Sequence, residues 1–393
     1  MIRSATAYTY ELDNPDLALE ELKTQVDGKI SLMAHTVGIL MCDPEYIEEG
    51  VLAYVSKGLP FPIVGATTMC QATDGEAGIL MMSLMVLTSD DVEFSVGMTG
   101  HIEAYGENLP EVTRIAYEEA AARLTHSPKL IIAFPPLIAE NGGDQYVDAL
   151  EAVCPKVPIF GTLAIEDSIE FDNCFSYAND EVSKTATSFI LVAGNVQPHF
   201  KIATISDENA LPYTGEITKS DRHIVYEIND VRCCDYFESI GFAKNGVLDK
   251  GLQFVPYLLD FYKRADYDGI SVVRAMVYFD ENGAGVCRGY MYENSVFTLT
   301  NPTDEDVLST SAQALDAIAA DENKQAVLLF SCMVRRMSLG AEPLKEANLL
   351  MEKMSPDTPY MLAYAGGEIC PTTSMENKVT NRFHNYSLIA LIL

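Results

Sequence analysis

Three stretches near the C-terminus carry residue types that could bind or transform a small molecule: Ser331-Cys332-Met333-Val334-Arg335, Gly366-Gly367-Glu368-Ile369-Cys370-Pro371 and His384-Asn385-Tyr386-Ser387. The planar fork of Arg335 can clamp a carboxylate through two parallel hydrogen bonds, as an amino acid or another small organic acid requires. Arg274, on an apolar strand, is a second candidate for this role. The alternative is that each arginine pairs with a carboxylate of the protein, for which Glu368 is one candidate.

Glu368 and Cys332 each allow two interpretations. Glu368 could hold a ligand ammonium, or it could satisfy backbone donors in the turn at Gly366 and Gly367. Cys332 could be a nucleophile if a cation lowered its thiol pKa, or it could be a small packed residue that closes a buried strand. We therefore assign no catalytic residue, with Cys332 as the alternative.

His384 and Asn385 resemble two members of the Cys-His-Asn set of thiol proteases. Neighbouring residues on a strand point to opposite faces, so these two cannot both orient one thiolate. We interpret them as structural or ligand-lining residues. In the N-terminal half, Gly65, Thr67 and Thr68 follow an apolar strand and could present backbone N–H groups to an anion.

Several common sites are absent from the sequence. There is no Walker A motif, no Gly-x-Gly-x-x-Gly, no His-Glu-x-x-His and no Cys-x-x-Cys. Six histidines and nine scattered cysteines show no metal-ligand spacing. The sequence thus predicts no metal site and no cofactor.

The elements that must position these residues alternate between strands and helices, which predicts an α/β fold with two domains. In the first domain, the series Gly38–Met41, Pro44–Lys57 and Pro62–Thr67 matches the series Leu130–Ala133, Gly143–Val153 and Pro158–Leu163. The match predicts an internally duplicated βαβα-plus-hairpin unit with a pseudo-twofold relation. The alternative is chance, because strand-glycine punctuation recurs in any α/β protein.

We expect the first domain over residues 1–205, with repeats at about 1–100 and 92–205. The polar stretch 206–221 is expected to be a linker, and 222–393 to form a mixed sheet with flanking helices. Local signals in this chain include Asn14 and Pro15 at a helix start, Asn282-Gly283 at a hairpin, and Thr303 at a helix N-cap.

Composition limits the partners. The chain has 393 residues, with 57 acidic side chains against 26 basic ones and a formal net charge of -31. A surface this negative repels phosphate backbones and anionic headgroups. We therefore expect neither nucleic acid nor a membrane as a partner. No apolar stretch approaches the ~20 residues of a membrane-spanning helix, and the start does not resemble a secretory signal, so we expect a cytoplasmic protein.

The three C-terminal stretches, in this order, resemble the C-terminal half of the FIST family (F-box and intracellular signal transduction proteins). That family has a strand-terminal Ser-Cys-x-x-Arg, a Gly-Glu-x-x-Pro turn and a His-Asn-x-Thr strand. Residues 65–71 stand where the family typically has Gly-Cys-Ser-Thr-Ala-Gly-Glu; Gly65 and Thr68 fit that pattern, whereas the cysteine, second glycine and glutamate do not. The resemblance covers both halves, which it identifies as FIST N-type and FIST C-type domains.

The resemblance implies a sensory module for a small ligand. We expect the ligand to be an amino acid or small organic acid, the protein to act through an unknown signalling partner or a change of homo-oligomer, and no output domain to be present. A haem-based gas sensor with His101 or His199 as axial ligand is one alternative. An enzyme that uses Cys332 is the other.

Overall fold

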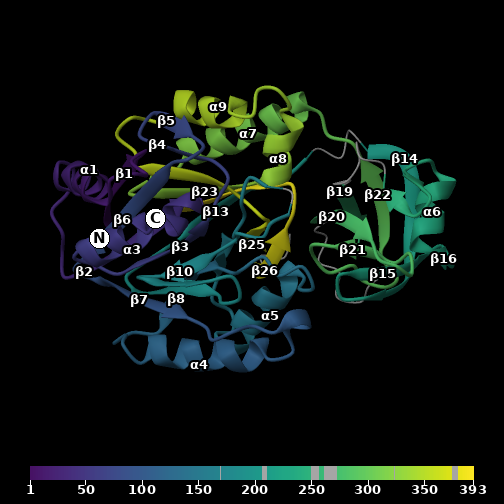
Figure 1. Ribbon diagram of the computed structural model, residues 1–393, viewed down its shortest axis with the longest axis horizontal. Coiled ribbons are helices and arrows are strands. Elements are labelled where there is room, and N and C mark those ends of the chain that lie inside the picture. The colour runs from purple at the N-terminus through teal and green to yellow at the C-terminus, as the bar shows by residue number, and fades with distance from the viewer. Residues whose placement is uncertain (169, 206–209, 249–255, 261–271, 323, 374–378) are drawn as a thin grey trace.

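The computed structural model describes residues 1–393 except 169, 206–209, 249–255, 261–271, 323 and 374–378. It has a large lobe and a small lobe (Figure 1). The mixed α/β class and two-domain architecture expected from the sequence are confirmed. Within the described residues, no helix combines the length and apolar character needed to cross a membrane.

The large lobe contains the expected repeat, in three copies rather than two. The first copy comprises β1 (Arg3–Thr9), α1 (Pro15–Asp27), β2 (His35–Cys42), α2 (Glu45–Glu48), α3 (Val51–Gly58), β3 (Ile63–Thr67), β4 (Gln71–Thr73), β5 (Glu76–Gly78) and β6 (Met82–Ser89). The second comprises β7 (Val92–Met98), a 3-10 turn (Ala104–Gly106), α4 (Leu109–Ala121), β8 (Pro128–Phe134), α5 (Gly143–Val153), β9 (Ile159–Thr162), β10 (Ser176–Ala178), β11 (Glu181–Ser183) and β12 (Ser188–Gly194).

The third copy begins at β13 (His199–Ala203) and resumes about a hundred residues later. It continues with α7 (Asp304–Ala319), β23 (Val327–Cys332), α8 (Met333–Ser338), α9 (Lys345–Lys353), β24 (Tyr360–Ala365), β25 (Glu368–Thr373), β26 (Val379–His384) and β27 (Leu388–Ile392). The small lobe is therefore an insertion between the first strand and the first helix of this copy.

Strand order shows that the three copies are joined in a ring. The sheets run β1-β6-β2-β3-β10-β11, β7-β12-β8-β9-β25-β26 and β13-β27-β23-β24-β4-β5. Each sheet thus has four strands of its own copy and a hairpin donated by the next copy in cyclic order. The expected pseudo-twofold relation is replaced by a threefold one, because the C-terminal strands complete the repeat.

These sheets also cross the expected boundary between residues 205 and 222. Strand β25 pairs with β9, and β24 pairs with β4. The expectation of a linker over 206–221 is wrong for its described part, because Ala210–Asp221 form strand β14, which pairs with both β15 and β22. Its Ile217 is completely buried, and its Leu211 and Tyr213 are partly buried against the same core, so apolar side chains anchor this largely polar strand.

The inner faces of the three sheets share one apolar core, in which Phe134, Phe160 and Phe330 stack or meet edge to face. Each outer face is covered by helices, with α1 and α3 on the first sheet, α4 and α5 on the second, and α7 and α9 on the third. Figure 1 shows α7 and α9 at the top and α4 and α5 at the bottom. Since loops at the carboxyl ends of parallel strands are free to present polar groups, these ends are the natural place for a site.

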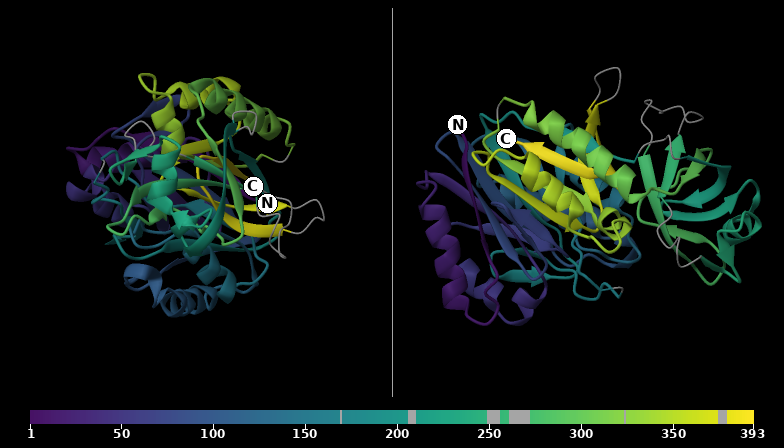
Figure 2. Two further views of the ribbon diagram at one scale, coloured as in Figure 1. Left: turned by 90° about the vertical axis from the view of Figure 1, so that its right-hand side faces the viewer. Right: turned by 90° about the horizontal axis from the view of Figure 1, so that it is seen from above.

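In its described residues, the small lobe has a seven-stranded sheet, a two-stranded hairpin and one helix. Its elements are β14 (Ala210–Asp221), β15 (Ile224–Ile228), β16 (Val231–Arg232), α6 (Cys233–Ser239), β17 (Ala243–Lys244), β18 (Val247–Leu248), β19 (Pro256–Asp260), β20 (Val272–Phe279), β21 (Gly285–Cys287) and β22 (Val296–Thr300). It lies beside β25, β26 and α8 of the large lobe (Figures 1 and 2). Its own core includes Ile217, Phe237 and Phe297.

Candidate functional site

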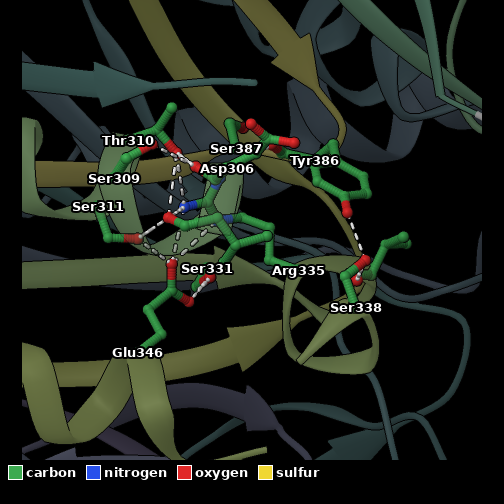
Figure 3. Close-up of polar contacts among 12 residues, drawn as sticks. Asp306, Ser309, Thr310, Ser311, Ser331, Arg335, Ser338, Glu346, Tyr386 and Ser387 are labelled. Atoms are coloured by element: carbon green, nitrogen blue, oxygen red, sulfur yellow. Dashed lines mark hydrogen bonds and ion pairs between the residues drawn. The ribbon is translucent and has the colours of Figure 1, made fainter. Parts of the chain in front are cut away.

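Arg335 does not face a ligand. Its side chain is completely buried, and Nε and Nη2 donate to Glu346 Oε1 at 3.0 and 2.8 Å. Nη2 also donates to Ser311 Oγ at 2.7 Å (Figure 3). The predicted carboxylate clamp at Arg335 is therefore wrong, and the alternative of an internal ion pair is what the structure shows. The partner is Glu346 on α9 rather than Glu368.

Arg274 is also neutralised within the protein. This arginine on β20 is 2% exposed, and its Nη2 lies 3.2 Å from Asp144 Oδ2 at the start of α5. Its Nη1 donates to the Phe383 carbonyl at 2.9 Å. Because Asp144 and Phe383 belong to the large lobe, Arg274 holds the lobes together and is not a free ligand clamp.

Cys332 and Glu368 lie together in the buried interior of the third copy. Burial raises the pKa of Glu368 to about 8, although Ser387 donates to its carboxyl through N–H and Oγ–H and lowers it in part. Burial and the adjacent Glu368 raise the pKa of the Cys332 thiol well above its ordinary value. A nucleophile needs the opposite shift, so the raised pKa argues against the alternative of an enzyme that uses Cys332.

His384 and Asn385 have structural partners. Nε2 of His384 lies 3.1 Å from the Cys370 carbonyl, and burial lowers its pKa to about 3, so the ring is neutral. Asn385 Oδ1 accepts a hydrogen bond from the Ala275 N–H of the small lobe at 3.2 Å. These contacts support the structural interpretation of both residues and leave neither as a free ligand-binding group.

The predicted glycine and threonine residues lie where the three copies meet. Thr68 donates to the Tyr364 carbonyl, and Thr67 N–H donates to the Phe175 carbonyl at 2.8 Å. Gly366 N–H donates to the Leu163 carbonyl at 3.1 Å, and the Gly367 carbonyl accepts from Leu163 N–H and from Thr162 Oγ1. A Cβ on Gly65 would stand 1.7 Å from the Leu40 carbonyl oxygen. Close backbone approach explains these residues, and they present no described donor to a ligand.

The structure thus separates the predicted residues into an interior group and a group at the contact between lobes. Between the lobes it reveals a residue that the sequence analysis missed, Arg288, which follows β21 in the small lobe. Its carbonyl accepts from Gly143 N–H at 2.8 Å, which places it against the start of α5. Unlike Arg274 and Arg335, its guanidinium has no ion pair or hydrogen bond with any residue that the structure describes.

Electrostatic coupling identifies the neighbours of Arg288. Its charge lowers the pKa of Tyr146 and Cys174, which burial raises by more. It also lowers the pKa of His223, which burial lowers further. Burial raises the pKa of Cys174 to about 12 and lowers that of His223 to about 4, so the thiol and the imidazole are both neutral. Burial also lowers the pKa of Arg288 itself, although the side chain is partly exposed. The Glu140 carboxylate acts on Arg288 electrostatically, but no carboxylate of the described residues lies close enough to form an ion pair with it.

Further polar groups around Arg288 are buried with few partners. Nδ1 of His223 lacks a hydrogen-bond partner within the described residues, and the side chains of Asn141 and Tyr146 have none there except one another. Their side chains are 2%, 1% and 4% exposed. Such groups cost free energy when unpaired, so several of them together need an explanation. We call these five residues the Arg288 cluster: Asn141, Tyr146, Cys174, His223 and Arg288.

The Arg288 cluster has the chemistry of a site for a small anion. A guanidinium binds a carboxylate through two parallel hydrogen bonds, and neutral amide, hydroxyl and imidazole groups can donate to the remaining lone pairs. It lacks an activated nucleophile, because Cys174 is held as a thiol. The sequence signal was an arginine after a short apolar strand and before a glycine, which is too common a pattern to stand out.

Metal or haem binding has little support in the described residues. They contain no group of three or more His, Cys, Asp or Glu arranged to hold a metal ion. His101 is exposed and its Nδ1 contacts Thr185 Oγ1 at 2.8 Å, while His199 Nδ1 lies 2.8 Å from Asp321 Oδ2.

Comparison with known families gives two matches that together cover most of the chain. The FIST N domain model matches residues 36–231, and the FIST C domain model matches residues 235–371. The chain belongs to the FIST family. FIST domains are sensory domains for small ligands, so a ligand-binding role in signalling is established at this general level.

Comparison of this FIST protein with curated proteins finds no match. Among solved structures, a cyanuric acid hydrolase described as an innovation by structural concatenation is 9% identical with a TM-score of 0.36, over 100% of this chain and 98% of the other. The cyanuric acid hydrolase from A. caulinodans is 8% identical with a TM-score of 0.35, over 100% and 99%. Likeness at this level says nothing about activity.

Proposed function

We propose that this FIST protein is a sensor of an amino acid or another small organic acid, whose carboxylate binds Arg288 between the lobes. One observation carries the proposal. Of the three buried or half-buried arginines considered above, Arg335 and Arg274 are neutralised by Glu346 and Asp144, whereas Arg288 has no partner in the described residues. The clamp expected from the sequence is therefore transferred to a different arginine.

The position of the cluster suggests how binding could be sensed. Arg288 and His223 belong to the small lobe, whereas Asn141, Tyr146 and Cys174 belong to the large lobe. A ligand that touches both lobes binds some lobe arrangements better than others, and a ligand shifts an equilibrium only by such a difference in affinity. We propose that the signal then passes to a partner protein or changes the homo-oligomeric state.

A thermal-shift screen tests the proposal. The twenty amino acids and a panel of small mono- and dicarboxylic acids are added to the wild type, to Arg288→Met and to Arg232→Met. Arg232 is a matched control because it is an exposed arginine of the same lobe, paired with Asp235 at 2.6 Å. We expect at least one acid to raise the melting temperature of the wild type and of Arg232→Met but not of Arg288→Met.

Two results would count against the proposal. One is a screen in which no acid stabilises the wild type. The other is a stabilising acid whose effect is the same in Arg288→Met. The haem alternative has a separate test, since haem titration of the purified protein would produce a Soret band that His199→Ala or His101→Ala removes.

A further inference from the structure

A second candidate site lies away from the Arg288 cluster, at the amino ends of β8 and β9. It is a groove of about 1060 Å³ between these strand ends, strand β13 and the end of β25. Pro128 and Lys129 form its wall on β8, and Lys156, Val157 and Pro158 form its wall before β9. We call it the lysine groove. It is independent of the function proposed above.

Strand β13 borders the lysine groove along an unpaired edge. It is the terminal strand of its sheet and pairs only with β27 among the described strands. The residues 196–198 that precede β13 line the groove, and so do residues 199–202 of the strand itself, without a break. Side chains of a strand alternate between its two faces, so a cavity that meets every residue in a row must run along the strand's edge. The open edge presents backbone N–H and C=O groups that another strand could use.

The charge of the lysine groove is opposite to that of the protein. Lys129, Lys156 and Lys201 all line it, and none of them makes an ion pair with the described residues. His199, which also lines it, contacts Asp321. In a chain with 57 acidic and 26 basic side chains, three unpaired lysines around one groove are unexpected on composition alone. They favour an anionic occupant.

Apolar groups complete the groove. Ile202 on β13 is 38% exposed and Val379 on β26 is 56% exposed, and both line it. A strand added to β13 would place alternate side chains toward these apolar surfaces and toward the lysines. Main-chain hydrogen bonds would supply affinity and alternate side chains would supply selectivity.

We propose that the lysine groove binds an extended, acidic segment of a partner protein, which adds as a strand to the free edge of β13. The five residues of β13 set the length of the segment at about five residues. The apolar residues of the segment pack near Ile202 and Val379, and its acidic residues face Lys129, Lys156 and Lys201. The site would therefore serve communication with a protein rather than detection of the small ligand.

Fluorescence anisotropy with a labelled, alternating Glu/Val heptapeptide tests this proposal on the full-length protein. We expect saturable binding that weakens as salt increases, and at least tenfold weaker binding of the corresponding Lys/Val peptide. The double variant Lys129→Glu, Lys201→Glu should bind the Glu/Val peptide at least tenfold more weakly. The charge-matched control is Lys23→Glu, Lys244→Glu, because both residues are exposed and make no ion pair with described residues.

Two N-methylated peptides test strand addition apart from charge. Alternate N–H groups of an added strand point toward and away from β13, so methylating one alternate set should abolish binding while methylating the other should preserve it. Hydrogen exchange across residues 196–203 should slow when the peptide binds. Both readouts follow from backbone pairing and would not respond to attraction by the lysines alone.

Several outcomes would overturn the proposal. They are equal binding of both N-methylated peptides, equal binding by the lysine variant and its control, or no binding of the Glu/Val peptide. Binding of decanoate in its place would assign the groove to a small amphipathic acid. A haem titration that yields a Soret band dependent on His199 and blocks the peptide would assign it to haem.

Discussion

Replacing Arg335 with Met should destabilise the protein strongly without touching the proposed ligand site. Its guanidinium makes two bonds to Glu346 and one to Ser311, and Glu346 is 1% exposed. Removing one partner leaves a buried carboxylate uncompensated, which typically costs roughly 3–5 kcal/mol. The remaining hydroxyls of Ser311 and Ser331, which donate at 2.5 and 2.6 Å, favour the lower part of that range.

The cost should depend on pH. Burial alone would raise the pKa of Glu346, but Arg335 and the two serine hydroxyls lower it below its ordinary value. The wild-type pair therefore contributes stability above the unfolded pKa of the carboxyl and loses it as pH falls through the folded pKa. In Arg335→Met, burial raises the pKa of Glu346, so the variant's disadvantage should grow by up to about 1.4 kcal/mol per pH unit above about pH 4.3.

Urea unfolding followed by circular dichroism, at pH 5 and pH 7.5, measures both effects. The double variant Arg335→Met, Glu346→Leu should recover at least half of the loss, because an apolar pair of similar volume can replace a buried ion pair at little cost. A loss below about 1 kcal/mol in the single variant, where burying an unpaired charge should cost more, would refute the reasoning. So would an equal loss at both pH values, or a double variant that is less stable than the single one.

Three other predictions follow from the buried groups. Because burial raises the pKa of Glu368 to about 8, its folded form keeps a proton that the unfolded form releases, so its contribution falls as pH rises from about 4.3 to 8. Glu368→Gln should flatten that fall in urea titrations, and an unchanged slope would contradict the assignment. All nine cysteines are buried, so iodoacetamide at pH 7 should label the native protein far more slowly than the unfolded protein. Mass spectrometry should show that Cys332 is not labelled before the other cysteines, and preferential labelling of Cys332 would support the enzyme hypothesis. Arg274→Met should leave the Asp144 carboxylate without its cation, although it still accepts from Tyr290 N–H at 2.7 Å. The variant should therefore lower the unfolding midpoint and speed limited proteolysis between the lobes, whereas Arg232→Met should do neither; equal effects of the two would argue against Arg274 as the interlobe tie.

Local signals in the sequence predicted the local structure well. Asn14 caps α1 by accepting from Leu17 N–H, with Pro15 at the first helical position. Thr303 caps α7 in a reciprocal arrangement with Asp306. Gly283 adopts a φ of 78° in the turn between β20 and β21, where glycine is favoured. Each of these depends on neighbours in sequence, so sequence alone can reveal it.

Long-range features were harder to predict for a physical reason. The third copy of the repeat is interrupted by the small lobe, so β13 and α7 are far apart in sequence although they belong to one unit. Likewise, Arg274, Arg288 and Arg335 are all arginines with no local feature to tell them apart. Only the fold determines which of them forms an ion pair with a carboxylate of the protein. Glu346, which neutralises Arg335, lies on a helix face with no motif to mark it.

The central claim is that Arg288 binds the carboxylate of the ligand. Isothermal titration calorimetry can compare the acid that most stabilises the wild type with its neutral primary amide, on the wild type and on Arg288→Met. A charged hydrogen bond is worth about 1.5–3 kcal/mol, so the wild type should bind the acid at least tenfold more tightly than the amide. Arg288→Met should bind the two alike. If Arg288→Met kept the full preference for the acid, the carboxylate would be recognised elsewhere and the account would be contradicted.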